Sequence, residues 1–288
     1  MEVAIIRSFI NIGSATSGNP AGVVLDLSKK LSDSEMQAIA RLVGLSETAF
    51  ISTGTQGANF DLRFFTPTDE VPLCGHATIA AFWYLHHIGM LTVGRYTQHT
   101  PAGMLPVEIT KTDSGEILVT MLQSTPKRCS DPLDFDSDFS KSFSSTYLNN
   151  SLPIEIWSTG LMDILLPINS RSDLNNMSVD FNALKKLSER FGVVGVHAFA
   201  IEDSQIYARN FAPLYGIDEE SATGTSNGAL IAYLSHHVKG DLYHEAMILQ
   251  GEIMGALSKI YAKYSLAENN EVSIWVGGNA TLDTLKPL

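Results

Sequence analysis

The feature that most constrains the fold of this chain is an internal repeat. Two stretches, CGHATIAAFWYLHH and TGTSNGALIAYLSHH, open at Gly75 and Gly224 and continue as apolar runs of helical length that end in two histidines. The second glycine follows the first by 149 residues, and the upstream segments RFFTP (63–67) and RNFAP (209–213) match at a shift of 146. A chance alignment is the alternative, but several matches in the same order predict two copies of one α+β unit.

Strand-like segments flank both predicted helices, and a polar segment separates the two copies. Residues 123–145 are rich in Ser and Asp and are the best candidate for a linker. We therefore expect an N-terminal α+β domain over residues 1–122 and a C-terminal one over residues 123–288. The sequence leaves open whether the terminal strand returns to the first domain.

Composition narrows the class of protein further. The chain has 288 residues, 44% of them hydrophobic and 17% charged, so it can bury a sizeable core. Its formal net charge of −12 argues against a nucleic-acid partner, which would call for a basic face. No apolar run approaches the roughly 20 residues of a membrane span. With only two cysteines and no leader-like start, the sequence predicts a cytoplasmic protein.

The glycine at each helix opening suggests a role in anion binding. The first turn of a helix carries unpaired N–H groups and the positive end of the helix dipole, which together favour a carboxylate. If the two copies face each other, both openings point into one inter-domain cleft. Such a cleft would hold a small carboxylate and stabilise the enolate formed when an adjacent carbon loses a proton.

Several motifs then connect the chain with a known family. SGNPAGVVL, GLSETAFI, RFFTPTDEVPLCGHATIAA, STGL, EESATGTSNGAL and IWVGGNA together resemble the PhzF-like (phenazine biosynthesis-like) family of the diaminopimelate-epimerase-fold superfamily. The resemblance runs from about residue 8 to residue 280. It implies two pseudo-symmetric α+β domains, each a strand barrel around a central helix, and a cofactor-independent isomerase that is commonly a homodimer.

The resemblance also implies the catalytic residues. Glu47 matches the family's general acid/base, and its partner in the second copy, Val196, is apolar, as a one-sided proton-transfer site would require. A surface or capping glutamate is the alternative. His76 is expected to contact substrate or relay a proton, with a helix-capping histidine as the alternative.

The predicted substrate-binding residues come from both copies. They are Asn19, Gly75, Glu220, Gly224 and Thr225. The second copy departs from the family here, because Glu220 and the following serine replace the usual Asp-Pro and Thr225 replaces a serine. Glu219 is the possible substitute for Glu220 in this role. Asn19 could instead serve only to form its turn. The duplicated arginines at 63 and 209 are expected to form structural ion pairs.

No metal or cofactor is expected. The positions three and four residues after His76 are Ile79 and Ala80, so the helix carries no local metal motif. Cys74 faces Thr223 in the alignment, which argues against a two-thiol racemase. A small buried residue is the expected role of Cys74, although a racemase with an unusual partner for it remains a third option.

These observations lead to one function and one rival. The expected function is an isomerase or epimerase that moves a proton on a small carboxylate or amino-acid-like metabolite, with Glu47 as the acid/base. The alternative is a protein that binds or senses a small acid on the same fold without turnover, an option that the altered loop at Glu220 favours.

Overall fold

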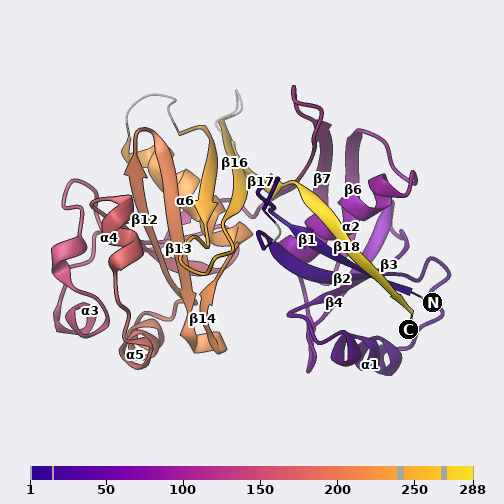
Figure 1. Cartoon of the computed structure of the whole chain (residues 1–288), viewed down its shortest axis with the longest axis horizontal. Coiled ribbons are helices and arrows are strands. Elements are labelled where there is room, and N and C mark those ends of the chain that lie inside the picture. Colours follow the sequence, from indigo (N-terminus) through magenta and orange to yellow (C-terminus); the bar gives the residue numbers. More distant parts are fainter. Residues whose placement is uncertain (1, 15, 239–242, 267–270, 288) are drawn as a thin grey trace. The chain divides into compact units, whose positions relative to one another are not determined.

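The computed structural model describes residues 2–14, 16–238, 243–266 and 271–287. The chain divides into two compact units, one formed by residues 1–122 with 277–288 and the other by residues 123–276 (Figure 1). The terminal segment therefore lies with the first unit and not in a second domain of residues 123–288. The reason is β18 (Ala280–Pro287), which pairs antiparallel with β1 (Glu2–Ser8) along its length.

The first unit consists of strands around a buried helix. Its further elements are β2 (Asn19–Leu25), α1 (Asp33–Val43), β3 (Thr48–Thr53), β4 (Phe60–Phe65), β5 (Glu70–Val71), α2 (Gly75–His87), β6 (Gly94–Thr100), β7 (Gly103–Lys111) and β8 (Ile117–Leu122). Helix α2 contacts β1, β2, β3, β7, β8 and β18, so the strands wrap around it. This explains why α2 is apolar on almost every side, whereas α1 is amphipathic and covers the outer surface of the strands.

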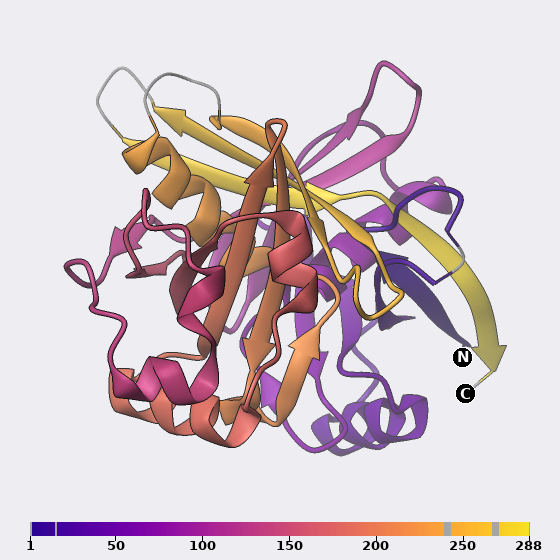
Figure 2. The ribbon, with the colours of Figure 1, turned by 60° about the vertical axis from the view of Figure 1, so that its left-hand side comes forward.

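The second unit repeats this arrangement. Its elements are β9 (Lys127–Arg128), α3 (Ser137–Ser142), β10 (Glu155–Ser158), β11 (Met162–Ile168), α4 (Arg171–Asn176), α5 (Phe181–Phe191), β12 (Gly195–Glu202), β13 (Gln205–Ala212), β14 (Ile217–Glu220), α6 (Gly224–His237), β15 (Glu245–Gln250), β16 (Ser258–Leu266) and β17 (Val272–Gly278). Helix α6 packs against β10, β11, β15 and β16 (Figure 2). Helices α3 to α5 supply apolar residues to a second core on the outer side.

Strand pairing confirms the duplication. In the first unit β1 pairs antiparallel with β2, β2 parallel with β3, β3 antiparallel with β4, and β4 parallel with β6. In the second, β10, β11, β12, β13 and β15 pair in the same order and directions. The expected fold class, two α+β repeats with a helix inside each set of strands, is therefore correct.

The registers refine the alignment of the two copies. Phe50 lies opposite Arg63 in the first unit, and Ala198 lies opposite Arg209 in the second. If the arginines correspond, β3 and β12 differ by 148 residue numbers, and the counterpart of Glu47 is Gly195 rather than the predicted valine. A Cβ at Gly195 would lie 1.7 Å from the carbonyl oxygen of a β13 phenylalanine. The second copy thus has no room for a side chain where the first carries an acid.

The predicted linker is wrong. Within residues 123–145, β9 pairs with β10, and α3 is capped by Asp136, whose carboxylate accepts from two backbone N–H groups. Phe139 and Phe143 are buried in the outer core of the second unit. Two aromatic residues one helical turn apart thus anchor a segment whose Ser and Asp content suggests a loop.

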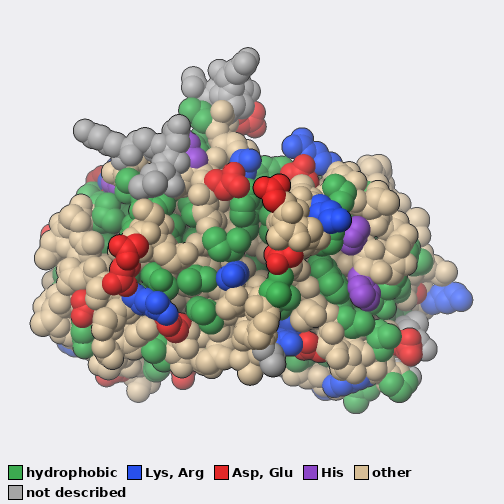
Figure 3. Space-filling view, turned by 45° about the horizontal axis from the view of Figure 1, so that its top comes forward, with side chains coloured by type: hydrophobic (Ala, Val, Ile, Leu, Met, Phe, Trp, Pro, Cys, Tyr) green, Lys and Arg blue, Asp and Glu red, His purple; other side chains and the backbone are tan. Residues whose placement is uncertain are grey.

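One face of the molecule carries side chains of both charges. Figure 3 shows a face on which acidic, basic and histidine side chains are interspersed with apolar ones. Within the ranges described above, no helix is both long enough and apolar enough to cross a membrane.

Candidate active site

Glu47 lies in the short connection between α1 and β3. Helix α1 ends at Gly44, which adopts the left-handed conformation that suits glycine. The N–H of Gly22 on β2 donates to the carbonyl of Glu47 at 3.1 Å. A Cβ at Gly22 would lie 2.7 Å from the hydroxyl of Thr48, so glycine is needed for this close approach. The backbone that carries the carboxylate is therefore held by the neighbouring strand.

His76 stands between Cys74 and Glu47. Its Nδ1 lies 3.4 Å from the Cys74 sulfur, and its Nε2 lies 3.4 Å from Oε2 of Glu47. The side chains of His76 and Glu47 are 7% and 21% exposed. Oε2 of Glu47 is itself buried and makes no hydrogen bond to any described residue, so its polar contact is the one of 3.4 Å with the imidazole of His76. An imidazole beside a carboxylate can hold or pass on its proton.

The same three side chains could hold a metal ion. One ligand atom each from Glu47, Cys74 and His76 lies within 4.8 Å of the other two. Thiolate, imidazole and carboxylate are ligands that zinc accepts. The spacing along α2 could not indicate this cluster, because its carboxylate comes from another segment. Cys74 is buried, as expected.

The main chain of His76 is anchored by the first strand. The hydroxyl of Ser8 on β1 donates to the carbonyl of His76 at 2.7 Å. Asn19, the first residue of β2, lies directly opposite Ser8 and is 8% exposed. The structure thus brings Asn19, Glu47, Gly75 and His76 to the same region of the first unit.

The second unit places Glu220 at the end of β14, shortly before α6. Oε2 of Glu220 accepts a hydrogen bond of 2.6 Å from the hydroxyl of Thr223. The preceding Glu219 instead forms two hydrogen bonds, of 2.9 and 2.8 Å, to the buried guanidinium of Arg209. Arg63 makes the equivalent paired contact with a glutamate on β5. The expectation of structural ion pairs is confirmed for both arginines.

Gly224 and Thr225 form the first turn of α6. The hydroxyl of Thr159, from the STG segment after β10, donates to the carbonyl of Thr225 at 2.8 Å. The next residue, Ser226, donates to the carboxyl of Asp163 at 2.7 Å. Asp163 is 1% exposed, and burial raises the pKa of its carboxyl to about 7. The sequence reasoning missed Asp163, whose only signal is an acid inside the apolar strand MDILLPI.

The two central helices differ from the others at their N-termini. In the described part of the chain, α1, α3, α4 and α5 each begin with a Ser or Asp whose side chain accepts a hydrogen bond from the first turn. Cys74 and Thr223 precede α2 and α6, and neither side chain makes such a bond. Their first turns are thus not capped by the preceding side chain, an arrangement that suits binding of an external carboxylate.

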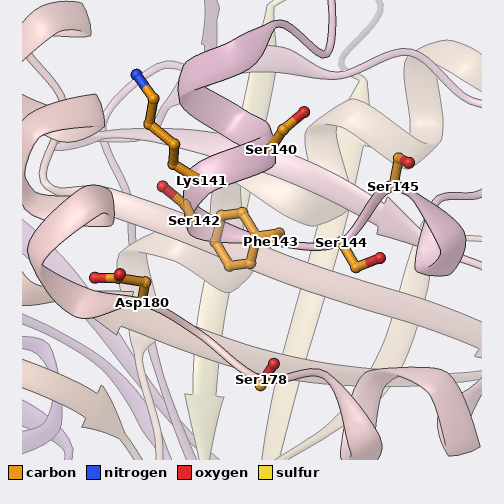
Figure 4. Close-up of a pocket in the computed structure, with 8 residues that line it drawn as sticks. All are labelled: Ser140, Lys141, Ser142, Phe143, Ser144, Ser145, Ser178 and Asp180. Atoms are coloured by element: carbon orange, nitrogen blue, oxygen red, sulfur yellow. The ribbon is translucent and has the colours of Figure 1, made fainter.

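A polar pocket in the second unit is unrelated to these residues. Ser142, Phe143, Ser144 and Asp180 are among the residues that line it (Figure 4). Its polar groups have structural tasks, because Asp180 caps α5 and Ser144 caps the short 3₁₀ turn that follows. None of the predicted site residues lines this pocket.

Comparison with known proteins defines the family. The phenazine biosynthesis-like protein family (PhzC-PhzF) matches residues 12–284, and the chain belongs to this family. It is 36% identical over 286 residues to an uncharacterized isomerase of Clostridium acetobutylicum, covering 92% of this chain and 91% of that protein. It is 27% identical over 281 residues to trans-2,3-dihydro-3-hydroxyanthranilate isomerase of Pseudomonas fluorescens, covering 96% and 94%. The chain is accordingly an isomerase of this family.

Solved structures support the fold. A phenazine biosynthesis protein of the PhzF family from Bacillus anthracis superposes with a TM-score of 0.88 at 27% identity, covering 99% of this chain and 97% of that one. A hydroxyproline epimerase from Agrobacterium vitis superposes with a TM-score of 0.65 at 11% identity, covering 100% and 90%. The second likeness concerns the fold alone and identifies it as diaminopimelate-epimerase-like.

Proposed function

We propose that this isomerase moves a proton on a small carboxylate-containing metabolite, with Glu47 as the acid/base. The main support is that Oε2 of Glu47 is buried, lacks a hydrogen-bond partner among the described residues, and lies 3.4 Å from Nε2 of His76. A carboxylate oxygen that accepts no hydrogen bond from the described residues is able to accept a proton from a substrate carbon. His76 then stabilises either protonation state and passes the proton on.

Backbone N–H groups at the helix starts are proposed to bind carboxylate groups, at Gly75 in the first unit and at Gly224 in the second. Both glycines open a helix whose first turn lacks a side-chain cap. Asn19, Glu220 and Thr225 are proposed to contact the remainder of the substrate. Negative charge that develops on carbon next to the carboxylate would be stabilised by the same positive helix ends.

The substrate is proposed to resemble the compound that the Pseudomonas fluorescens relative is named for, a ring with a carboxylate and an amino group. At 27% identity this relative suggests a class of compound and not the compound itself. A panel for testing should therefore contain trans-2,3-dihydro-3-hydroxyanthranilate with other small amino and carboxylic acids. The homodimer and the cytoplasmic location remain predictions.

The decisive experiment measures solvent deuterium in the substrate. The protein is incubated with each panel compound in D₂O, and mass spectrometry detects exchange at carbon. Glu47→Gln is expected to keep the fold and to lose at least about 10²-fold in exchange rate, as removal of a general base does. Glu116→Gln, an exposed hairpin glutamate in the same unit, is the matched control and should exchange like the parent.

Two results would contradict the proposal. Equal exchange by the parent and the Glu47→Gln variant would exclude Glu47 as the base. Binding of a panel compound without any exchange by the parent would favour the alternative of a small-acid binding protein.

A further inference from the structure

A chain of buried amide and imidazole groups runs through the second unit to the loop before α6. The side chains of Asn210, His197, Asn227 and Gln250 are each no more than 2% exposed. They come from β13, β12, α6 and β15, so four elements contribute to one chain. The proposed reaction uses none of these side chains directly.

The contacts are continuous from one end to the other. Nδ1 of His197 lies 3.0 Å from the Asn210 amide, and its Nε2 lies 3.1 Å from Oδ1 of Asn227. Nδ2 of Asn227 donates to Oε1 of Gln250 at 2.7 Å and to the carbonyl of Thr223 at 2.7 Å. Nε2 of Gln250 donates to the carbonyl of Glu220 at 2.7 Å. The chain therefore reaches both ends of the loop.

The last contacts of the chain reach the Glu220 carboxylate. Nε2 of Gln250 also lies 3.1 Å from the hydroxyl of Thr223, and Oε1 of Gln250 accepts from the Thr223 N–H at 3.3 Å. The Thr223 hydroxyl in turn donates to Oε2 of Glu220. One glutamine thus fixes the loop backbone at both ends and orients the threonine that bonds the carboxylate.

The directions of these hydrogen bonds follow from the donors available. Because Nδ2 of Asn227 is occupied by two acceptors, its Oδ1 faces His197, and Nε2 of His197 must donate. A neutral imidazole has one N–H, so its Nδ1 accepts from the Asn210 amide, whose oxygen and nitrogen are interchangeable by a flip. Burial lowers the pKa of His197 to about 4, which keeps the imidazole neutral near pH 7.

Among its described residues, the first unit has no equivalent of the full chain of hydrogen bonds. Its central helix also uses its fourth residue, Thr78, to bond Cys74 and a buried glutamine, Gln98, but the second contact is 3.4 Å long. Nε2 of Gln98 ends on a methionine sulfur rather than on the loop, and β3 (TAFIST) carries no histidine. The extended chain of hydrogen bonds is therefore a feature of the second unit.

We propose that His197, Asn227 and Gln250 are positioning residues that hold the Glu220–Thr223 loop, and with it the Glu220 carboxylate, in the geometry that receives the substrate. This inference rests on the proposed function only for the statement that Glu220 contacts the substrate. Residues 220–225 (ESATGT) contain no proline, so no residue of the loop has a φ fixed by a ring. The buried hydrogen-bonded side chains restrain the loop backbone instead.

The test measures amide hydrogen exchange and needs no substrate. His197→Phe keeps an aromatic ring at the buried position but cannot donate to Asn227. We expect exchange in residues 220–225 to accelerate about tenfold or more, while β12 and β13 change less than about twofold. His197→Gln, which can donate to Asn227, should restore most of the protection. A structural role alone would loosen the whole unit evenly.

Further variants keep the test decisive. If His197→Phe does not fold, Gln250→Met takes its place. Methionine has a side chain of similar length but cannot make the glutamine's hydrogen bonds, so exchange in residues 220–225 should accelerate. Gln98→Met in the first unit is the matched control and should leave residues 220–225 unchanged. Unchanged exchange in this segment in both second-unit variants, or equal acceleration throughout the unit, would overturn the proposal.

Activity then separates this proposal from the proposed function. For a panel compound that the parent exchanges, His197→Phe should raise KM about tenfold and change the maximal exchange rate less. If Glu47→Gln leaves exchange intact while residues 220–225 still loosen in His197→Phe, the acid/base proposal fails and the positioning of the loop stands.

Discussion

At the scale of single residues, two buried groups of the second unit have strongly shifted pKa values. Burial raises the pKa of Asp163 to about 7 and lowers that of His197 to about 4. Between about pH 4 and pH 7, Asp163 is protonated and neutral in the folded protein but ionised in the unfolded chain. Between about pH 4 and pH 6.5, His197 is neutral in the folded protein but protonated in the unfolded chain. Each makes folding stability depend on pH, and the two dependences have opposite signs.

The first prediction concerns Asp163. Between about pH 4 and pH 7 the folded state keeps a proton that the unfolded state has released, so stability falls as pH rises, by up to about 1.4 kcal/mol per pH unit. Asp163→Asn removes this dependence. The stability of the variant relative to the parent should therefore increase from pH 4.5 to pH 7 and stay constant above pH 7. Urea unfolding at several pH values measures the difference, and a constant difference would contradict the assignment.

A companion prediction concerns His197. Because its folded pKa lies below 6.5, the unfolded state binds a proton that the folded state does not, and stability falls as pH drops from about 6.5 to 4. His197→Gln should lack this loss and gain relative to the parent over the same interval. The same urea series measures it, with Asp163→Asn as the comparison of opposite sign.

At the scale of elements, the glycine at the start of α2 allows structural and functional roles to be separated. A Cβ at Gly75 would meet no atom within 4 Å except its chain neighbours, so alanine fits there. Alanine also favours the helix over glycine by up to about 1 kcal/mol. The packing around this position therefore does not require glycine. The close approach of a ligand to the backbone would require it.

Gly75→Ala is accordingly expected to leave the free energy of unfolding unchanged or slightly higher, and to slow substrate exchange at least about tenfold. Thermal unfolding and the deuterium assay measure the two effects. Gly22→Ala is the contrasting variant, because its Cβ would lie 2.7 Å from the Thr48 hydroxyl and should destabilise the fold. Full activity in Gly75→Ala would remove the binding role of this glycine.

Most elements with a clear local pattern could be predicted from the sequence, and those without one could not. The apolar runs of α2 and α6 and their glycine starts are local signals. Strand β15 (EAMILQ) has no clear local pattern, because a polar residue stands at each end of a short apolar run. Helix α3 lies in the predicted linker, and its only apolar residue is Phe139, so its sequence does not indicate an amphipathic helix. Both elements are stabilised by contacts with segments distant in sequence.

At the scale of the whole chain, the first unit is completed by the last strand. Pairing of β18 with β1 runs from Glu2 opposite Pro287 to Ser8 opposite Ala280, which brings the two ends of the chain together (Figure 1). An ion pair of 2.7 Å between Arg7 and Asp283 spans the same two strands. The stability of the first unit therefore depends on a strand that lies far from the rest of that unit in the sequence.

A chain that ends at Gly278 is expected to lose roughly 3 kcal/mol of the first unit's stability, because β1 loses one row of backbone hydrogen bonds and a covering strand. Hydrogen exchange should report the loss in β1 and β2 and leave α6 protected. Asp283→Ala, which removes only a partly exposed ion pair, should cost under about 1 kcal/mol. Equal loosening of both units by the truncation would contradict this account.

The duplication, the two buried helices and their glycine openings follow from the sequence, because local periodicity and matches at a fixed spacing encode them. The convergence of Cys74, His76 and Glu47 follows only from the fold. So do the ion pair of Glu219 with Arg209, the hydrogen bond of Glu220 with Thr223, and the connection of His197 to Gln250. Such contacts join residues that lie far apart in the chain or face each other only once strands pair. Strand register and burial fix them, and neither leaves a pattern in neighbouring residues.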